Sequence, residues 1–233
     1  MKVSAQVPRL NDVNLKTSGG HLEITGLEGS VDAKTSGGGI ACNDIRGNVT
    51  VYTSGGSVSC EQITGSLEAR TSGGGIHLAS ITGPFNAKTS GGRIEAEALT
   101  GDGSLATSGG GIEVNACNGR LDAATSGGSI EVSGHEGAVT TNTGGGNISV
   151  TFNSPPVDNC ELKTSAGSIT LLIPRQTNAY VDAKTSSGRV STDLPILVQG
   201  DTGRGELHGQ IGESGPTLTL KTSGGSIKIS ALD

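Results

Sequence analysis

The chain has 233 residues, a net charge of −6, 40 glycines and only 2% aromatic residues. So few aromatic side chains argue against a conventional two-layer core, and the sequence lacks the Gly-X-Y period of collagen. The acidic balance, without a basic cluster, argues against a nucleic-acid partner. No apolar run reaches the ~18 residues that a membrane span needs. The first residues, MKVSAQVPRL, also lack the apolar centre of a signal peptide.

The dominant feature of the sequence is a Thr-Ser-Gly-Gly motif that returns every 18 residues. The threonines of the regular copies are Thr17, Thr35, Thr53, Thr71, Thr89, Thr107, Thr125 and Thr143. Three later copies, at wider spacing, contain Thr164, Thr185 and Thr222. Glycine supplies the positive φ values that a tight corner demands, so we interpret each motif as one corner of a repeating coil.

Each 18-residue unit contains two predicted strands when the threonine is numbered as position 7. Positions 3, 5 and 7 alternate with mostly polar positions 4 and 6, as in a strand with one buried face. A second strand follows the corner, with a branched aliphatic residue at position 12 and a small or aliphatic one at position 14. In many units an apolar residue at position 17 breaks this alternation and predicts a bend near positions 15 and 16. The pattern contains no predicted helix.

Equal residues at equal positions favour a parallel β-solenoid over an antiparallel meander. Each coil of a solenoid lies about 4.8 Å from the next, so corners and small residues recur in columns. We therefore expect an all-β, single-chain, right-handed parallel β-solenoid with 18-residue coils. The threonine column should point inward beside the corner, with each hydroxyl bonded to a backbone group or to the next threonine, and we interpret it as structural.

The regularity of the repeat changes after residue 150. We predict a regular solenoid over residues 1–150 and a continuation of the same solenoid over residues 151–233, as one domain overall. Loop insertions at coil corners are predicted at 151–163 and 174–180.

The two ends of the stack are expected to differ. Residues 194–220 have lost the motif but keep a strand-like alternation at their end, and we predict that residues 194–233 form the irregular last coils and a cap. A cap is needed because an open solenoid end exposes unpaired backbone groups. At the other end, one short strand before Pro8 should give less protection.

The cysteines and histidines suggest no shared site. Cys42 and Cys60 both occupy position 14 of successive units, so a disulfide between them is within reach. We favour the alternative that both are small core residues. Cys117 and Cys160 should lie too far apart along the stack to join a site, and the histidines map to distant coils. The sequence contains no zinc, nucleotide or other cofactor motif.

One column of carboxylates is the candidate for a binding surface. Glu95, Glu113 and Glu131 all occupy position 13 on the outer face. Three carboxylates about 4.8 Å apart repel each other by roughly 1 kcal/mol per neighbouring pair in water, which a cation or a basic partner could relieve. One carboxylate per coil falls short of the roughly 6–8 oxygens that calcium takes. We therefore favour a solvated face, and we predict no catalytic, metal-binding or cofactor-binding residues.

Several segments resemble a known bacterial family. The segments are VDAKTSGGGI, LDAATSGGSI, VDAKTSSGRVSTDLP and the tail LHGQIGESGPTLTLKTSGGSIKIS. Together they resemble a bacterial β-strand-repeat family of TSGG-repeat solenoids, described as adhesins, whose role is unassigned. The resemblance implies a single-chain solenoid outside the cytoplasm or at the cell surface, often attached to an anchor. It implies no catalytic residues.

The favoured function is a non-enzymatic surface module that binds a surface protein or a glycan, or acts as a rigid spacer. The alternative is a structural protein whose solenoids associate end to end into filaments. A carbohydrate-active enzyme comes a distant third, because it needs a carboxylate pair across a groove that regular coils do not supply.

Overall fold

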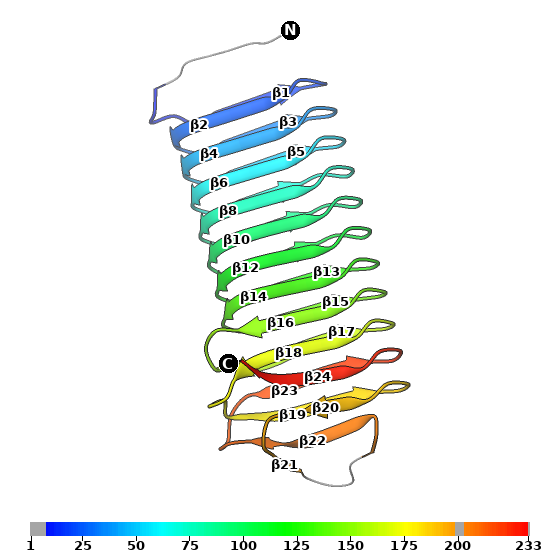
Figure 1. The fold of residues 1–233 in the computed structure, drawn as a ribbon. Coiled ribbons are helices and arrows are strands. Elements are labelled where there is room, and N and C mark those ends of the chain that lie inside the picture. The colour runs from blue at the N-terminus through cyan, green and yellow to red at the C-terminus, as the bar shows by residue number, and fades with distance from the viewer. Residues whose placement is uncertain (1–7, 199–202, 233) are drawn as a thin grey trace.

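The computed structural model describes residues 8–198 and 203–232 of the chain. These residues form strands joined by short corners, with no helix among them. The strands stack as a ladder from one end of the molecule to the other (Figure 1). The predicted all-β parallel solenoid is therefore confirmed. The short strand predicted before Pro8 lies outside the described residues.

The strands form two sheets that face each other across the core. The larger sheet contains β1 (Val13–Thr17), β3 (Val31–Thr35), β5 (Val49–Thr53), β7 (Leu67–Arg70), β9 (Phe85–Lys88), β11 (Gly103–Ala106), β13 (Leu121–Thr125), β15 (Val139–Thr143), β17 (Cys160–Thr164), β19 (Ala179–Thr185), β21 (Ile196–Val198), β22 (Glu206–Ile211) and β23 (Thr217–Thr222). The smaller sheet contains β2 (Leu22–Glu28), β4 (Ile40–Arg46), β6 (Val58–Thr64), β8 (Ile76–Thr82), β10 (Ile94–Thr100), β12 (Ile112–Asn118), β14 (Ile130–Glu136), β16 (Ile148–Phe152), β18 (Ile169–Pro174), β20 (Val190–Thr192) and β24 (Ile227–Leu232).

Successive coils pair in parallel, in a register of one full repeat. Val31 pairs with Val49 in the larger sheet, and Ile40 pairs with Val58 in the smaller one. Every inward column is therefore continuous, and the inward side chains form one aliphatic core along the stack. The interior is only one pair of side chains thick, which explains why small residues such as Ala69 fill it and aromatic residues are scarce.

The Thr-Ser-Gly-Gly corner needs its second glycine because the coils approach each other closely there. The expectation that the corner requires positive φ values is wrong, since none of the described glycines of the motif has a positive φ. A Cβ atom at Gly74 would lie 2.1 Å from the carbonyl oxygen of Gly56 in the preceding coil. A Cβ atom at the first glycine, Gly73, would meet nothing closer than 3.4 Å. This difference explains why the later copies of the motif carry Ala166 and Ser187 at the first glycine position but retain the second glycine.

The predicted bend is a single residue at position 16 with a left-handed backbone. Five non-glycine residues at this position have φ between 52° and 58°: Asp44, Gln62, Ser80, Ala98 and Ala116. Gly26 and Gly134 take the same conformation in their coils, with φ of 71° and 65°. The left-handed residue lets the strand turn slightly, so that positions 14 and 17 both point inward. The three-residue step between the apolar positions 14 and 17 is the sequence feature that predicts this bend.

The end of the chain is not the end of the stack. Nine coils, β1/β2 to β17/β18, follow one another in chain order, but the sheet order then becomes β17-β23-β19 and β18-β24-β20. The C-terminal coil, β23 with β24, therefore lies between the β17/β18 coil and the β19/β20 coil, both of which precede it in sequence (Figure 1). The prediction that residues 194–233 form the last coils and the cap is wrong for β23 and β24. They lie inside the stack, because β23 carries the same inward pattern as its neighbours and fits between them.

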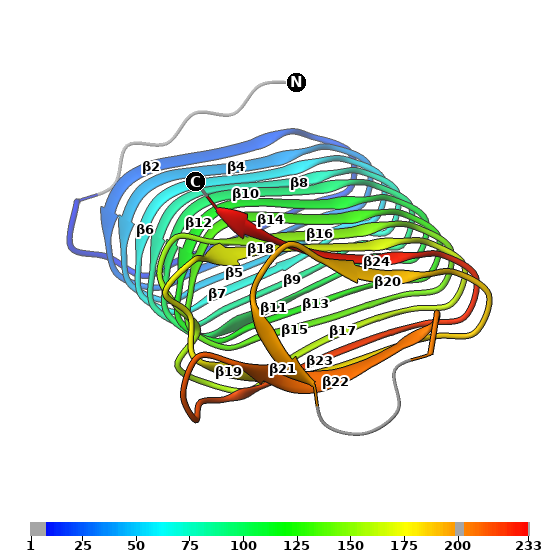
Figure 2. The same ribbon diagram turned by 60° about the horizontal axis from the view of Figure 1, so that its bottom comes forward.

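The cap is formed by the strands that precede the C-terminal coil. β22 pairs antiparallel with β19, and β21 pairs antiparallel with β22, at the end of the stack that comes forward in Figure 2. Two polar side-chain contacts join β22 to β19: His208 Nδ1 lies 3.0 Å from Asp182 Oδ1, and Lys184 forms an ion pair with Glu206. Asp182 also pairs with Lys221 of β23 at 3.3 Å, so one carboxylate connects three strands.

Candidate functional site

The threonine column forms a continuous ladder of hydrogen bonds between coils. Each hydroxyl donates to a glycine carbonyl of a neighbouring coil at 2.6–3.0 Å, as seen at Thr35, Thr53, Thr71, Thr89, Thr107, Thr125, Thr143, Thr164, Thr185 and Thr222. The same hydroxyl accepts the N–H group three residues later in its own coil, as Thr89 does from Gly92 at 3.2 Å. Thr17, in the first coil, accepts from Gly20 at 3.3 Å.

These bonds show what the threonines do. A hydroxyl has one proton to donate, and each of these inter-coil bonds uses it on backbone rather than on the next threonine. The residues are buried from Thr35 onward. The column therefore connects the corners of adjacent coils and is not exposed to a ligand.

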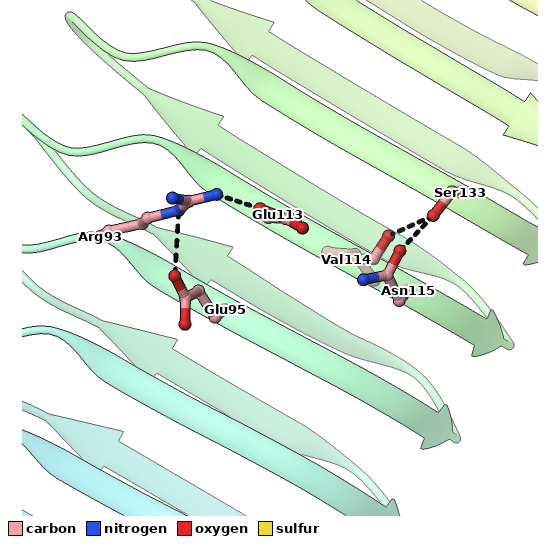
Figure 3. Close-up of polar contacts among 6 residues, drawn as sticks. All are labelled: Arg93, Glu95, Glu113, Val114, Asn115 and Ser133. Atoms are coloured by element: carbon pink, nitrogen blue, oxygen red, sulfur yellow. Dashed lines mark hydrogen bonds and ion pairs between the residues drawn. The ribbon is translucent and has the colours of Figure 1, made fainter.

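The predicted carboxylate column lies on the outer face of the smaller sheet. Glu95, Glu113 and Glu131 pair in register on β10, β12 and β14. Arg93 pairs with Glu95 at 3.3 Å and also with Glu113 in the next coil (Figure 3). The repulsion between those two carboxylates is thus relieved from within the chain. Further along the same face, the Ser133 hydroxyl lies within hydrogen-bond distance of two acceptors, the Val114 carbonyl oxygen and the Asn115 side-chain oxygen (Figure 3).

A shallow trough of about 480 Å³ lies beside the carboxylate column on the same face. Three successive coils line it with small residues, including Gly39, Ser57 and Gly75, and with one aliphatic residue each: Ile40, Val58 and Ile76. His21 stands at one end, and His77, Arg93 and Glu95 stand at the other. The trough was not predicted from the sequence. A signal for it exists at position 11, where the side chains of successive coils change from large to small and back to large: His21, Gly39, Ser57, Gly75 and Arg93. It offers polar and cationic groups around a flat, partly apolar floor.

A second hollow, of about 730 Å³, lies at the opposite corner of the coils. It is bounded by the loop after β16, whose Val157 is 77% exposed, and by Asp102, Arg120 and Glu136. The loop occupies residues 153–159, within the insertion predicted at 151–163. The second insertion, predicted at 174–180, is the short turn between Pro174 and Ala179.

Cys42 and Cys60 lie in register on adjacent strands, as their positions predicted, and both are buried free thiols. Their mutual hydrogen bond, together with burial, raises the pKa of the Cys60 thiol. Burial raises the pKa of the Cys117 thiol to about 11, and it also raises the pKa of Cys160. A thiol with a raised pKa is a poor nucleophile, which applies to Cys60, Cys117 and Cys160. All four cysteines are buried and act as small core residues.

One histidine is part of the core, which sequence reasoning missed. His135 is fully buried, and its ring packs edge-on against Phe152 with 5.5 Å between the centroids. Its Nε2 atom lies 3.1 Å from the Ala138 carbonyl oxygen, whereas its Nδ1 atom has no hydrogen-bond partner. Burial lowers the pKa of His135, because the charged ring would be desolvated. His135 occupies position 17, where most other units carry an aliphatic residue or a cysteine.

Within residues 8–198 and 203–232, no group of three or more His, Cys, Asp or Glu side chains could hold a metal ion. In the same ranges there is no helix long and apolar enough to cross a membrane.

The fold and its surfaces define the class of protein: a β-solenoid repeat module of stacked coils. The family model Toastrack DUF4097 matches residues 100–230, and the chain belongs to this family of unknown function. No curated protein and no solved structure matches the chain. The family and the fold fit a non-catalytic structural repeat module.

Proposed function

We propose that this chain is a rigid rod of finite length at the bacterial cell surface. The rod displays a lateral face to a surface protein or a glycan and holds that face at a distance from the point where the chain is attached to the cell. One observation carries the proposal: the coils repeat regularly along the stack, and antiparallel strands close one end of it. Eleven parallel coils at about 4.8 Å give a length of roughly 50 Å. A finite rod with continuous flat faces is suited to display, because every outward column is presented in a fixed array.

The trough is the part of the lateral face that suits a ligand best. It extends across about three coil spacings, or roughly 14 Å, which is the length of two or three sugar rings. Its serine and histidine groups can bond to hydroxyls, and its flat floor, which includes Ala41 and Gly75, can contact the apolar face of a sugar ring. These features favour a short glycan over a bulky, convex protein surface.

Filament formation is the second candidate, and one feature favours it. Among the described residues, β1 and β2 each have a neighbouring strand on one side only, and Leu10 beside them is 77% exposed. Edges of this kind can pair with another chain. The cap works against long filaments, because pairing at a single free end stops at a dimer.

The assembly state separates the rod from the filament. Light scattering and negative-stain microscopy over a wide range of concentrations should give separate particles of uniform length. Fibres of constant width that lengthen with concentration would contradict the finite rod and support filament assembly.

The display role can be tested with a glycan array and a pair of matched variants. Ser57→Trp fills the trough, and Ser129→Trp places the same side chain in the same column but outside it; both serines are exposed. Binding should be lost in the first variant and kept in the second. Equal binding by both variants, or no binding by the unmodified chain, would remove the trough from the proposal.

The location needs a separate experiment in the bacterial cell. Protease added to intact cells should degrade the chain while a cytoplasmic control protein survives. Full protection of the chain until the cells are lysed would contradict a surface location.

A further inference from the structure

The position of the C-terminal coil has a consequence for how the chain can associate. β23 and β24 pair in parallel with a coil on each side: with β17 and β18 on one, and with β19 and β20 on the other. The two flanking coils precede it in sequence. The C-terminal coil therefore fills a slot between two parts of the chain that are synthesised before it.

The slot matches the C-terminal coil through the same contacts that hold the regular coils together. Thr222 donates to the Gly167 carbonyl at 2.8 Å on one side, and Thr185 donates to the Gly225 carbonyl at 2.6 Å on the other. These are the inter-coil bonds of the threonine ladder. Nothing in them distinguishes a C-terminal coil of the same chain from that of another copy.

The slot can also close without a change of register. Cys160 pairs with Leu218, which pairs with Val181, so removal of the middle strand would bring Cys160 opposite Val181. By the same relation Thr164 would face Thr185. The chain can thus keep a continuous stack while the slot is empty, because coils of a solenoid need only equivalent neighbours.

The connection into the C-terminal coil is short and peripheral. Residues 212–216 lead from β22 past the end of β19 to β23, and residues 212–215 are exposed. Hydrogen bonds at both ends of this link tie it to neighbouring loops and strands: Asn178 Oδ1 accepts from Glu213 N at 2.8 Å, and the Pro216 carbonyl accepts from Tyr180 N at 2.9 Å. Just beyond the link, Asn159 Oδ1 accepts from Thr217 N at 2.8 Å. A link of this kind can act as the hinge of an exchanged element.

We propose that the C-terminal coil, residues 217–232, is an exchangeable element, and that the slot between β17/β18 and β19/β20 accepts the same coil from a second copy of the chain. Reciprocal exchange joins two rods near their capped ends. This association does not depend on the proposed display function. It also differs from filament growth, since it closes after two chains.

Three stacked lysines allow the exchange to be measured in the full chain. Lys163, Lys221 and Lys184 lie in register on β17, β23 and β19, with side chains 44–58% exposed. Equal amounts of unlabelled and ¹⁵N-labelled chain are unfolded together, refolded at high concentration and separated by size. Each fraction is treated with a lysine-reactive cross-linker, and the cross-linked peptides are analysed by mass spectrometry.

The dimer fraction should contain Lys163–Lys221 cross-links of mixed isotope composition, up to about half of that pair if exchange is complete. Lys16 and Lys34 are paired in register on β1 and β3, within the consecutive coils, and serve as the internal control. Their cross-links should join peptides of the same isotope only. If the refolded chain is monomeric at every concentration, or if Lys163–Lys221 cross-links are never mixed, the proposal is wrong.

A hinge variant gives a second readout. Four Gly and Ser residues inserted between Ser214 and Gly215 lengthen the link, which should make the chain's own slot easier to fill. The mixed Lys163–Lys221 fraction should then fall severalfold, because short hinge loops favour exchange between chains. An unchanged mixed fraction would overturn the assignment of residues 212–216 as the hinge.

Discussion

The two glycines of each corner differ in what a methyl group would meet. Gly74→Ala places a Cβ atom 2.1 Å from a backbone oxygen, and backbone cannot move aside without separating the coils. We expect this variant to lose about 2–3 kcal/mol of unfolding free energy. Gly73→Ala, one residue earlier, meets only ordinary contacts at 3.4 Å and should change stability by less than about 0.5 kcal/mol. Urea unfolding followed by circular dichroism measures both, and equal losses would contradict the close-approach explanation.

The left-handed residue at position 16 gives a prediction of opposite sign. Ala98 has φ of 52°, a conformation that costs a residue with a Cβ atom roughly 1 kcal/mol relative to glycine. Ala98→Gly should therefore stabilise the chain by about that amount, as glycine already does in two other coils. Ala124→Gly makes the same chemical change on the regular strand β13, where it should destabilise by about 0.5–1 kcal/mol. Thermal unfolding of the two variants should show shifts in opposite directions; a shift in the same direction would refute the strain at Ala98.

At the scale of the strand, the sequence predicted most of the fold. The 18-residue spacing located both strands of each unit, and the step from position 14 to position 17 located the bend, because in a stack each of these features recurs in a column. The order of the last coils could not be predicted in the same way. ELKTSAGSI, YVDAKTSSGRV and TLKTSGGSI carry the same inward pattern, so each coil fits against either of the others. Which coil lies in the middle depends on pairing between segments that are distant in sequence, and the local sequence pattern does not specify that pairing.

The candidate site, too, could be predicted from the sequence only in part. The positions of Glu95, Glu113 and Glu131 in one column followed from the repeat, and their register pairing agrees with it. The trough depends on a run of small side chains between two larger ones, which has meaning only when the coils are read as a stack. His135 was overlooked because a histidine at position 17 was read by its chemistry alone, although the column is an inward one.

The strand β14 carries a group that should make stability depend on pH. Burial lowers the pKa of His135 in the folded chain, so the unfolded chain binds a proton at this residue at a higher pH than the folded chain does, at about 6.5. The free energy of unfolding should therefore fall as the pH drops below about 6.5, by at most about 1.4 kcal/mol per pH unit, until the folded pKa is passed. The carboxylate of Glu136 beside the ring favours the charged form and reduces this effect.

His135→Leu isolates this contribution, since leucine occupies the same column at Leu99. The difference in unfolding free energy between the original chain and the variant, measured in urea from about pH 8 to pH 5, should be constant above pH 7 and should then change in favour of the variant. Groups other than His135 titrate alike in both proteins and cancel. A difference that stays constant throughout this range would mean that His135 does not remain neutral in the fold.

At the scale of the whole molecule, a stack of coils has stability that varies along its axis. Coils in the middle have a neighbour on both sides, as β10 has β8 and β12, whereas β1 and β2 each pair with one strand among the described residues. Because each coil interacts mainly with its neighbours, end coils can open without the rest. The cap, with β21 and β22 over β19, should limit such opening at its end of the rod.

Native-state hydrogen exchange followed by mass spectrometry measures this gradient directly. Peptides that cover β1 and β2 should exchange at least about tenfold faster than peptides that cover β10 and β12, because opening the terminal coil breaks one inter-coil interface while opening a central coil breaks two. Peptides from β19, which lies under the cap and beside the C-terminal coil, should be closer to the central value than to the value of the first coil. Equal protection along the whole chain would show instead that the rod unfolds as a single cooperative unit.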